Sequence, residues 1–285
     1  MQSSDNVFAK INNEYYELTS SEKKVADYIV LHQQKTQFMS ITELAEACGV
    51  AEATISRFCR RMKYKGYNAF KLSVANSTAD RAAANPLSGE VLPEDSVSDM
   101  CQKIYTADVD AITQTLGLIK PEAISAAADL LMASQRVLCM GQGGSMILAQ
   151  EAAHLFSTAQ PGFSAVWDSH LQVVAASQLT EHDVVLYFSY SGATRDLMDV
   201  VKIVHQRQAK TILITRFPNS PGAAYADVVL QCGSREGPLQ LGSVAARIAQ
   251  LYLIDVLFSE LCRRDIEGCK MRREMVADAL SDKHI

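Results

Sequence analysis

The chain has 285 residues, of which 48% are hydrophobic and 21% are charged, so it can bury ordinary globular cores and is not generally disordered. At roughly 100–200 residues per domain, this length predicts two domains. The apolar runs are shorter than the about 20 residues of a membrane span, and the N-terminus lacks the pattern of a signal peptide. We therefore expect a cytoplasmic protein with no membrane partner.

The formal net charge of −5 is unevenly distributed. Residues 1–80 contain ten Lys and Arg residues against nine Asp and Glu residues, a balance of +1, so the remaining residues carry −6. Within Glu52–Lys71, six basic residues stand against one acidic residue. A local basic patch of this kind is what binding to a phosphate backbone requires.

The first domain shows helical periodicity only. A Ser/Thr cap ahead of Glu22 predicts a helix over Ser20–His32. A short helix is expected over Ser40–Gly49, where the final glycine permits the left-handed turn that ends it. Helical spacing resumes over Val50–Met62. A helix, a tight turn with glycine and a second helix predict an all-α helix-turn-helix domain.

The second helix of this motif presents polar and basic residues away from its apolar face. If Ile55 and Phe58 pack inward, the N-terminal part of the helix is small or polar and suits a major groove. We expect Arg57 and Thr54 to reach base edges and the later basic residues to contact phosphates. The alternative is a solvated basic face that contacts nothing. The candidate DNA-binding residues are Thr54, Ser56, Arg57, Arg60, Arg61, Lys63 and Lys65.

Residues 81–95 combine Pro86, Gly89 and Pro93 with small residues, which predicts a linker. The second domain is expected to span residues 96–285. It begins with helical spacing and a further helix that Pro121 opens at its first turn.

Short apolar runs then alternate with helical stretches. Continuous apolar strands separated by helices predict an α/β fold, a doubly wound parallel sheet covered on both faces. The candidate strands are Val137–Met140, Val184–Phe188, Thr211–Ile214 and Val228–Gln231, with Phe163–Val166 a weaker candidate. In such sheets ligands bind beyond the carboxyl ends of the strands.

Two strand-to-helix turns are candidates for holding an anion. Gly141-Gln-Gly-Gly-Ser145 lets backbone amides approach a ligand, but Met146 stands where a complete dinucleotide-binding motif has its last glycine. Ser189-Tyr-Ser-Gly-Ala-Thr194 carries three hydroxyls around a glycine. Together the turns predict a phosphate cradle. The alternative is that Ser and Thr only cap helices.

These paired turns resemble the signature of the sugar isomerase (SIS) domain, and a helix-turn-helix ahead of it resembles the RpiR/MurR family of bacterial regulators. The resemblance extends to Thr54–Phe58, Asp168–His170 and Ala246–Leu251. It implies that serine and threonine hydroxyls bind a phosphate, that Glu236 lies near the sugar, and that His170 serves the sugar end of the same site or of a neighbouring protomer's site.

The candidate effector-binding residues are Gly143, Ser145, His170, Ser189, Ser191, Thr194 and Glu236. Two positions depart from the family pattern: Ala193 replaces a common acidic residue, and Gln142 a common apolar one. No motif or histidine spacing indicates a metal, and the seven scattered cysteines form no C-x-x-C pair, so no cofactor is expected.

The resemblance implies a DNA-binding transcriptional regulator, expected to be a repressor of a carbohydrate catabolic operon. Its partners would be double-stranded operator DNA and a phosphorylated sugar effector, with an amino-sugar 6-phosphate such as N-acetylmannosamine 6-phosphate or N-acetylmuramic acid 6-phosphate preferred. A homodimer or higher homo-oligomer is expected because helix-turn-helix proteins read paired half-sites. The alternative is a sugar-phosphate isomerase with an accessory DNA-binding domain, in which Glu236 is the base and His170 assists.

Overall fold

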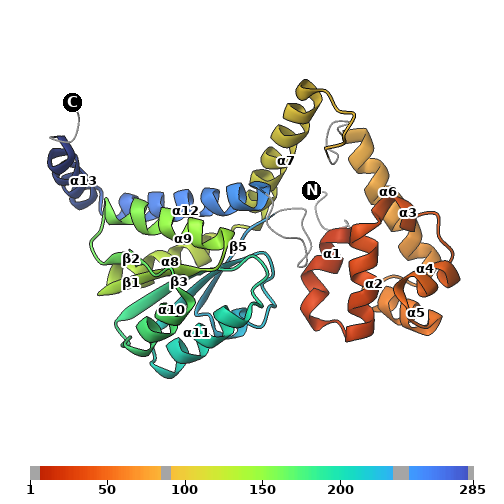
Figure 1. Ribbon diagram of the computed structural model, residues 1–285, viewed down its shortest axis with the longest axis horizontal. Helices are drawn as coiled ribbons and strands as arrows, with labels where there is room; N and C mark the ends of the chain where they lie inside the picture. The colour runs from red at the N-terminus through yellow and green to blue at the C-terminus, as the bar shows by residue number, and fades with distance from the viewer. Residues whose placement is uncertain (1–6, 85–90, 234–243, 282–285) are drawn as a thin grey trace. The chain divides into compact units, whose positions relative to one another are not determined.

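The computed structural model describes residues 7–84, 91–233 and 244–281 of the protein (Figure 1). The chain divides into two compact units, the first up to Ala107 and the second from Asp108, and the division falls within helix α7 (Val97–Leu118). No helix in the described ranges is both long and apolar enough to cross a membrane.

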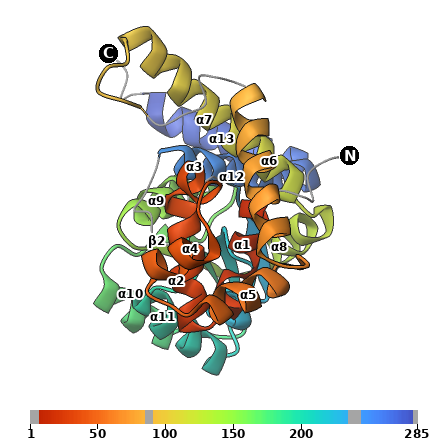
Figure 2. The same ribbon diagram turned by 90° about the vertical axis from the view of Figure 1, so that its right-hand side faces the viewer.

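The N-terminal unit is built from short helices (Figures 1 and 2). They are α1 (Val7–Glu14), the 3-10 helix η1 (Tyr15–Glu17), α2 (Ser20–Leu31), α3 (Gln33–Thr36), α4 (Ile41–Cys48), α5 (Glu52–Arg61) and α6 (Tyr67–Ala84). Local signals start and stop them: Thr19 and Glu22 form a capping box at α2, and Ser40 and Glu43 form another at α4. Gly49 ends α4 in the left-handed conformation, with φ of 62°.

One apolar core holds these helices together. Ile29 of α2, Leu44 of α4, and Ile55 and Phe58 of α5 are fully buried in it. The ring of Phe58 meets that of Phe70 on α6 edge to face, with centroids 5.7 Å apart. The helix-turn-helix expected from the sequence is therefore the pair α4 and α5, packed on α2.

The second unit is an α/β domain. Its helices are α8 (Pro121–Ala133), α9 (Gly144–Ser157), α10 (Ser169–Ser177), α11 (Arg195–Gln206), η2 (Ala223–Tyr225), α12 (Val244–Arg264) and α13 (Ile266–Ser281). Its strands are β1 (Arg136–Gly141), β2 (Phe163–Ala165), β3 (Asp183–Phe188), β4 (Lys210–Thr215) and β5 (Val228–Gln231). All pairings among the described strands are parallel, in the order β2-β1-β3-β4-β5.

Helices cover both faces of this sheet, as expected for a doubly wound fold (Figure 1). One face packs against α8, α9 and α12 in a core that includes Phe156 and Leu257. The other face packs against α10 and α11 through residues such as Tyr187 and Val201. Each strand expected from the sequence is present, and the parallel arrangement places all five carboxyl ends at one edge.

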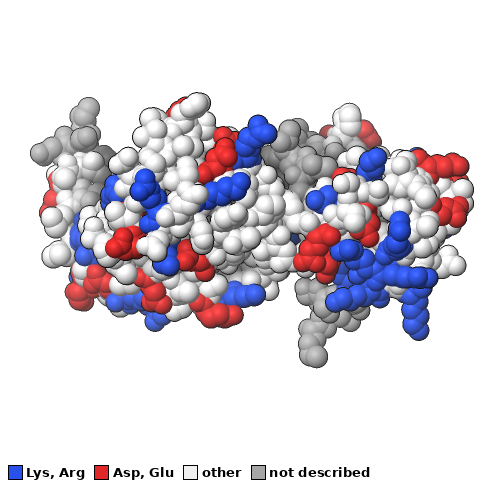
Figure 3. All heavy atoms as spheres, turned by 90° about the horizontal axis from the view of Figure 1, so that it is seen from below, with Lys and Arg blue, Asp and Glu red and all other residues white. Residues whose placement is uncertain are grey.

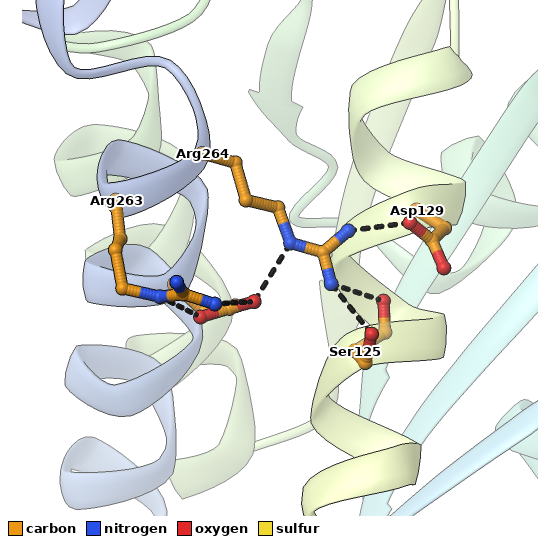
Figure 4. A network of polar contacts seen from close by, with 5 residues as sticks. Ser125, Asp129, Arg263 and Arg264 are labelled. Carbon is orange, nitrogen blue, oxygen red and sulfur yellow. Dashed lines mark hydrogen bonds and ion pairs between the residues drawn. The ribbon is translucent and has the colours of Figure 1, made fainter.

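A polar network joins the end of α12 to α8 (Figure 4). Glu260 accepts hydrogen bonds from the guanidinium groups of Arg263 and Arg264, which hold the pKa of its carboxyl at about 2. Arg264 also pairs with Asp129 and donates to the hydroxyl of Ser125 at 2.6 Å. The network fixes the end of α12 next to α8.

The segment expected to be a linker is partly helical. Helix α6 continues to Ala84, so residues 81–84 extend the last helix of the N-terminal unit. Residues 85–90 lie outside the described part of the chain, and α7 begins at Val97.

Candidate functional sites

The exposed side of helix α5 and the turn that follows it carry a cluster of basic residues. The side chains of Arg57, Arg60, Arg61, Lys63 and Lys65 are exposed, and Ser56 is half-buried. Figure 3 shows Lys and Arg gathered over part of the N-terminal unit. The first turn of α5 exposes only Glu52 and Ala53, so its N-terminal end is narrow, as entry into a major groove requires.

Thr54 does not lie on this outer face, contrary to the expectation from sequence. Its side chain is 7% exposed because residue 54 stands one helical turn before buried Phe58 and shares that face. The Thr54 hydroxyl accepts a hydrogen bond from Nη2 of Arg57 at 3.3 Å. In this arrangement Thr54 orients Arg57 and does not itself face outward.

Arg61 is exposed but engaged within the protein. Its Nη1 donates to the carbonyl oxygen of Glu17 at 2.9 Å, and its Nε lies 3.4 Å from Oε1 of Glu22. Burial raises the pKa of Glu22, but hydrogen bonds from Thr19 and the nearby positive charge of Arg61 outweigh it and leave that pKa below its usual value. Arg61 therefore ties α5 to the start of α2.

The two turns expected to hold an anion lie side by side. Gly141 at the end of β1 is paired in register with Phe188 at the end of β3. A Cβ added at Gly141 would stand 2.7 Å from the carbonyl oxygen of Ser145 and 3.1 Å from that of Phe188. Because no side chain fits between them, glycine is required for the turns to come this close.

The second turn, Ser189–Thr194, carries three serine and threonine hydroxyl groups on both sides of Gly192. Ser189 is 4% exposed, and its hydroxyl accepts the N–H of Gly192 at 3.2 Å. The hydroxyl of Ser191 accepts the N–H of Ala193, and that of Thr194 caps helix α11. A hydroxyl that accepts a backbone N–H can also donate its own hydrogen, so the turn can offer donors to a phosphate.

Gly192 is the tightest point of this turn. Its φ is +63°, and a Cβ there would lie 2.0 Å from the hydroxyl oxygen of Ser220. Both the left-handed conformation and the contact require glycine. The segment after β4, which contains Ser220, therefore packs directly against the hydroxyl-rich turn.

The first turn is held by a residue that the sequence did not reveal. Gln172 of α10 is fully buried, and its amide donates to the carbonyl oxygens of Gly141 and Val166. Gln142, which departs from the family pattern, donates to the side-chain oxygen of Gln172 at 3.0 Å. Nothing in the local pattern distinguishes Gln172 from a surface glutamine, because its burial depends on strands elsewhere in the chain.

The remaining candidates occupy different places. Gly143 caps α9 with φ of 55° and is exposed, and Ser145 is half-exposed in the first turn of that helix. His170 is exposed at the start of α10, which Asp168 caps, and follows the carboxyl end of β2. Glu236 lies outside the described residues. His170 thus shares the carboxyl edge of the sheet with both turns.

Arg216 is a second residue that sequence reasoning missed. It follows β4 directly, and its backbone N–H donates to the carbonyl oxygen of Tyr190, in the hydroxyl-rich turn, at 3.0 Å. Its position in the sequence could have identified it, because a polar residue immediately after a parallel strand lies at the edge of the sheet where ligands bind. In the described ranges, no group of three or more His, Cys, Asp or Glu side chains is arranged to hold a metal ion.

A helix-turn-helix unit with an exposed basic helix, followed by a parallel α/β unit, is the architecture of a two-domain DNA-binding protein. Residues 5–81 match the model of the helix-turn-helix domain of the rpiR family, and residues 130–260 match that of the SIS domain. The chain belongs to the RpiR family of transcriptional regulators with a C-terminal SIS domain.

Similar proteins extend over the whole chain. An uncharacterized HTH-type transcriptional regulator of Caldanaerobacter subterraneus is 33% identical over 98% of both chains, and one of Haemophilus influenzae is 30% identical over 100% of both. The structure of Vibrio vulnificus NanR complexed with ManNAc-6P matches with a TM-score of 0.63 and 25% identity, over 98% of this chain and 100% of that one. The relatives are named as HTH-type transcriptional regulators, and the chain is accordingly a DNA-binding transcriptional regulator.

Proposed function

We propose that this regulator is a repressor of a carbohydrate catabolic operon, controlled by a sugar phosphate bound at the carboxyl edge of the sheet. The observation that carries the proposal is the adjacency of the Gly141–Ser145 and Ser189–Thr194 turns, fixed by the pairing of Gly141 with Phe188. Backbone amides, hydroxyls and the N-termini of α9 and α11 converge there, as a phosphate requires.

The preferred effector is an amino-sugar 6-phosphate, with N-acetylmannosamine 6-phosphate and N-acetylmuramic acid 6-phosphate as first candidates. The similarity to V. vulnificus NanR, whose structure contains ManNAc-6P, supports this choice. Gly143, Ser145, Ser189, Ser191 and Thr194 bind the phosphate in this proposal. His170 and Glu236 contact the sugar, and His170 serves either its own site or that of a neighbouring protomer.

The DNA-binding surface consists of the exposed residues of α5 and the following turn. Arg57 reads base edges from a position set by Thr54, beside Ser56, while Arg60, Lys63 and Lys65 contact phosphates. In this proposal Arg61 contacts a DNA phosphate while it keeps its bonds within the protein. Two such helices are needed for paired half-sites, so we include a homodimer or higher homo-oligomer in the proposal.

The experiment that tests this function is fluorescence anisotropy on labelled DNA from upstream of the protein's own coding region, with a panel of sugar 6-phosphates. We expect one sugar phosphate to weaken DNA binding by about tenfold, a coupling of about 1.4 kcal/mol. A protein that binds no specific DNA, or whose DNA affinity no sugar phosphate changes, would contradict the proposal.

The double substitution Ser189→Ala with Ser191→Ala tests the assignment of the effector site. It should abolish the response to the sugar phosphate and leave the affinity for DNA without effector unchanged, because the hydroxyls lie in the other unit. The matched control is Ser157→Ala with Ser177→Ala, whose hydroxyls donate to carbonyl oxygens of their own helices. A full response in the first double variant would place the effector elsewhere.

A further inference from the structure

Arg216 is a buried charged residue whose guanidinium is incompletely paired. The residue is 5% exposed, and neither Nε nor Nη1 has a hydrogen-bond partner among the described residues. Isolated buried charge is costly, and removing one partner of a buried pair is usually destabilising. Folded proteins therefore rarely keep such a group unless something else pairs with it.

Most of the unpaired buried atoms belong to the segment that follows β4. Within the described ranges, five buried side-chain atoms lack a partner, and three of them belong to Arg216 and Ser220. Ser220 is 2% exposed and packs against Gly192 in the hydroxyl-rich turn. The backbone N–H of Arg216 is bonded to Tyr190 of the same turn. Both residues that carry these unpaired atoms therefore contact the turn assigned to the phosphate.

This turn supplies no positive charge of its own. Residues 189–194 contain hydroxyls, one glycine and backbone amides, but no Lys or Arg. Arg195, which follows the turn, is exposed at the start of α11. A phosphate carries nearly two negative charges at neutral pH. A buried guanidinium on a residue whose backbone is bonded to the turn would supply the positive charge that the turn lacks.

We propose that Arg216 is a specificity-determining residue of the effector site and pairs with an anionic group of the bound effector. The inference rests on the proposed function, because it takes the hydroxyl-rich turn as the effector site. The anionic group is either the phosphate itself or a second acidic group on the sugar, such as a carboxylate. An arginine is suited to both because its planar donors bind oxygen pairs bidentately.

The test compares wild type, Arg216→Met and the control Arg207→Met in the full-length protein. Arg207 is exposed at the opposite end of α11 from the turn, so its substitution removes the same charge away from the site. Thermal unfolding is followed in chloride buffer and with increasing inorganic phosphate, neutral hexose 6-phosphates, amino-sugar 6-phosphates and sugar-acid 6-phosphates. Ligand binding to the folded state raises the melting temperature and reports affinity.

We expect Arg216→Met to melt no lower than wild type without ligand, because an unpaired buried charge is removed, and to lose at least tenfold in affinity for anionic ligands. Loss of affinity for every phosphate, including inorganic phosphate, identifies the phosphate as the partner. Loss confined to the sugar-acid phosphates identifies a carboxylate. Arg207→Met should match wild type throughout.

The inference is overturned if Arg216→Met keeps its affinity for every ligand that stabilises wild type, whatever its melting temperature without ligand. If Arg216→Met does not fold, Arg216→Lys decides: this variant keeps the charge but not the planar donors, and unchanged affinity for all ligands would overturn the proposal. Failure of the proposed function looks different, because then no sugar phosphate stabilises wild type, or the double substitution at Ser189 and Ser191 has no effect.

Discussion

Asp183 at the start of β3 is a buried carboxylate with a full set of partners. It is 1% exposed, accepts two hydrogen bonds from Arg136, at 3.0 and 2.7 Å, and accepts two more from the N–H and hydroxyl of Thr180. The guanidinium of Arg136 is the main cause that lowers the pKa of Asp183 to about 2. The ion pair should therefore contribute to the free energy of unfolding of the second unit, and this contribution should be lost in acid.

Because the folded-state pKa of Asp183 lies below its ordinary value, its stabilising contribution is present above about pH 4 and is lost as the pH falls toward 2. Asp183→Asn should lower the free energy of unfolding at pH 7 by about 1–2 kcal/mol, allowing for solvent around half-exposed Arg136. It should also flatten the loss of stability between pH 4 and 2. Urea unfolding across pH checks this, with exposed Glu181→Gln as the control; equal acid sensitivity of Asp183→Asn and wild type would contradict it.

Neighbouring arginines on α5 should behave differently. Arg60→Ala should leave the melting temperature unchanged and reduce the slope of log affinity for DNA against log salt by about 1, because one phosphate contact is lost. Arg61→Ala should lower the melting temperature, because it removes the bonds to Glu17 and Glu22. Calorimetry and salt titrations separate the two effects. Identical behaviour of the two variants would refute this division of roles.

The surroundings of individual side chains follow least directly from the sequence. Periodicity placed the buried face of α5 correctly at Ile55 and Phe58, but it did not assign Thr54 to that face. Arg61 is bonded to Glu17 and Arg216 to Tyr190, and both partners are distant in the chain. Local spacing carries no information about such partners.

Among the elements, the turn between α4 and α5 depends on one glycine. Gly49 has φ of +62°, and an added Cβ would meet nothing within 4 Å, so the only cost of a side chain is backbone strain. Gly49→Ala should destabilise the N-terminal unit by about 1 kcal/mol, and Gly49→Asn by less, because asparagine tolerates the left-handed conformation. Chemical denaturation measures both. Equal stability of all three proteins would show that the turn relaxes to another conformation.

The sequence was most informative about the positions of helices and strands. The capping boxes at α2 and α4, the αL glycine and the apolar strands are signals that act within a few residues. The end of α6 was not foreseen, because small residues near Ala84 suit both a helix and a linker. A helix end without a capping signal is set by what it packs against.

For the whole molecule, the proposed control implies reciprocal coupling between two sites in different units. If the effector weakens DNA binding by a given factor, saturating operator DNA must weaken effector binding by the same factor, because the two binding free energies are linked. Calorimetric titration of the sugar phosphate with and without operator DNA tests this. If the effector changes the affinity for DNA but DNA does not change the affinity for the effector, the two measurements do not describe one binding equilibrium.

Local patterns in the sequence were enough to predict a helical DNA-binding part, a parallel α/β part, its strands, and the two glycine-containing turns that follow β1 and β3. These follow from local periodicity, capping and glycine, which act over short distances along the chain. Only the packed structure shows that these two turns lie side by side, that Gln172 holds the first, that Arg61 ties α5 to α2, and that Arg216 is buried. Burial and pairing depend on which distant elements meet, and that is fixed only when the sheet and the helices pack.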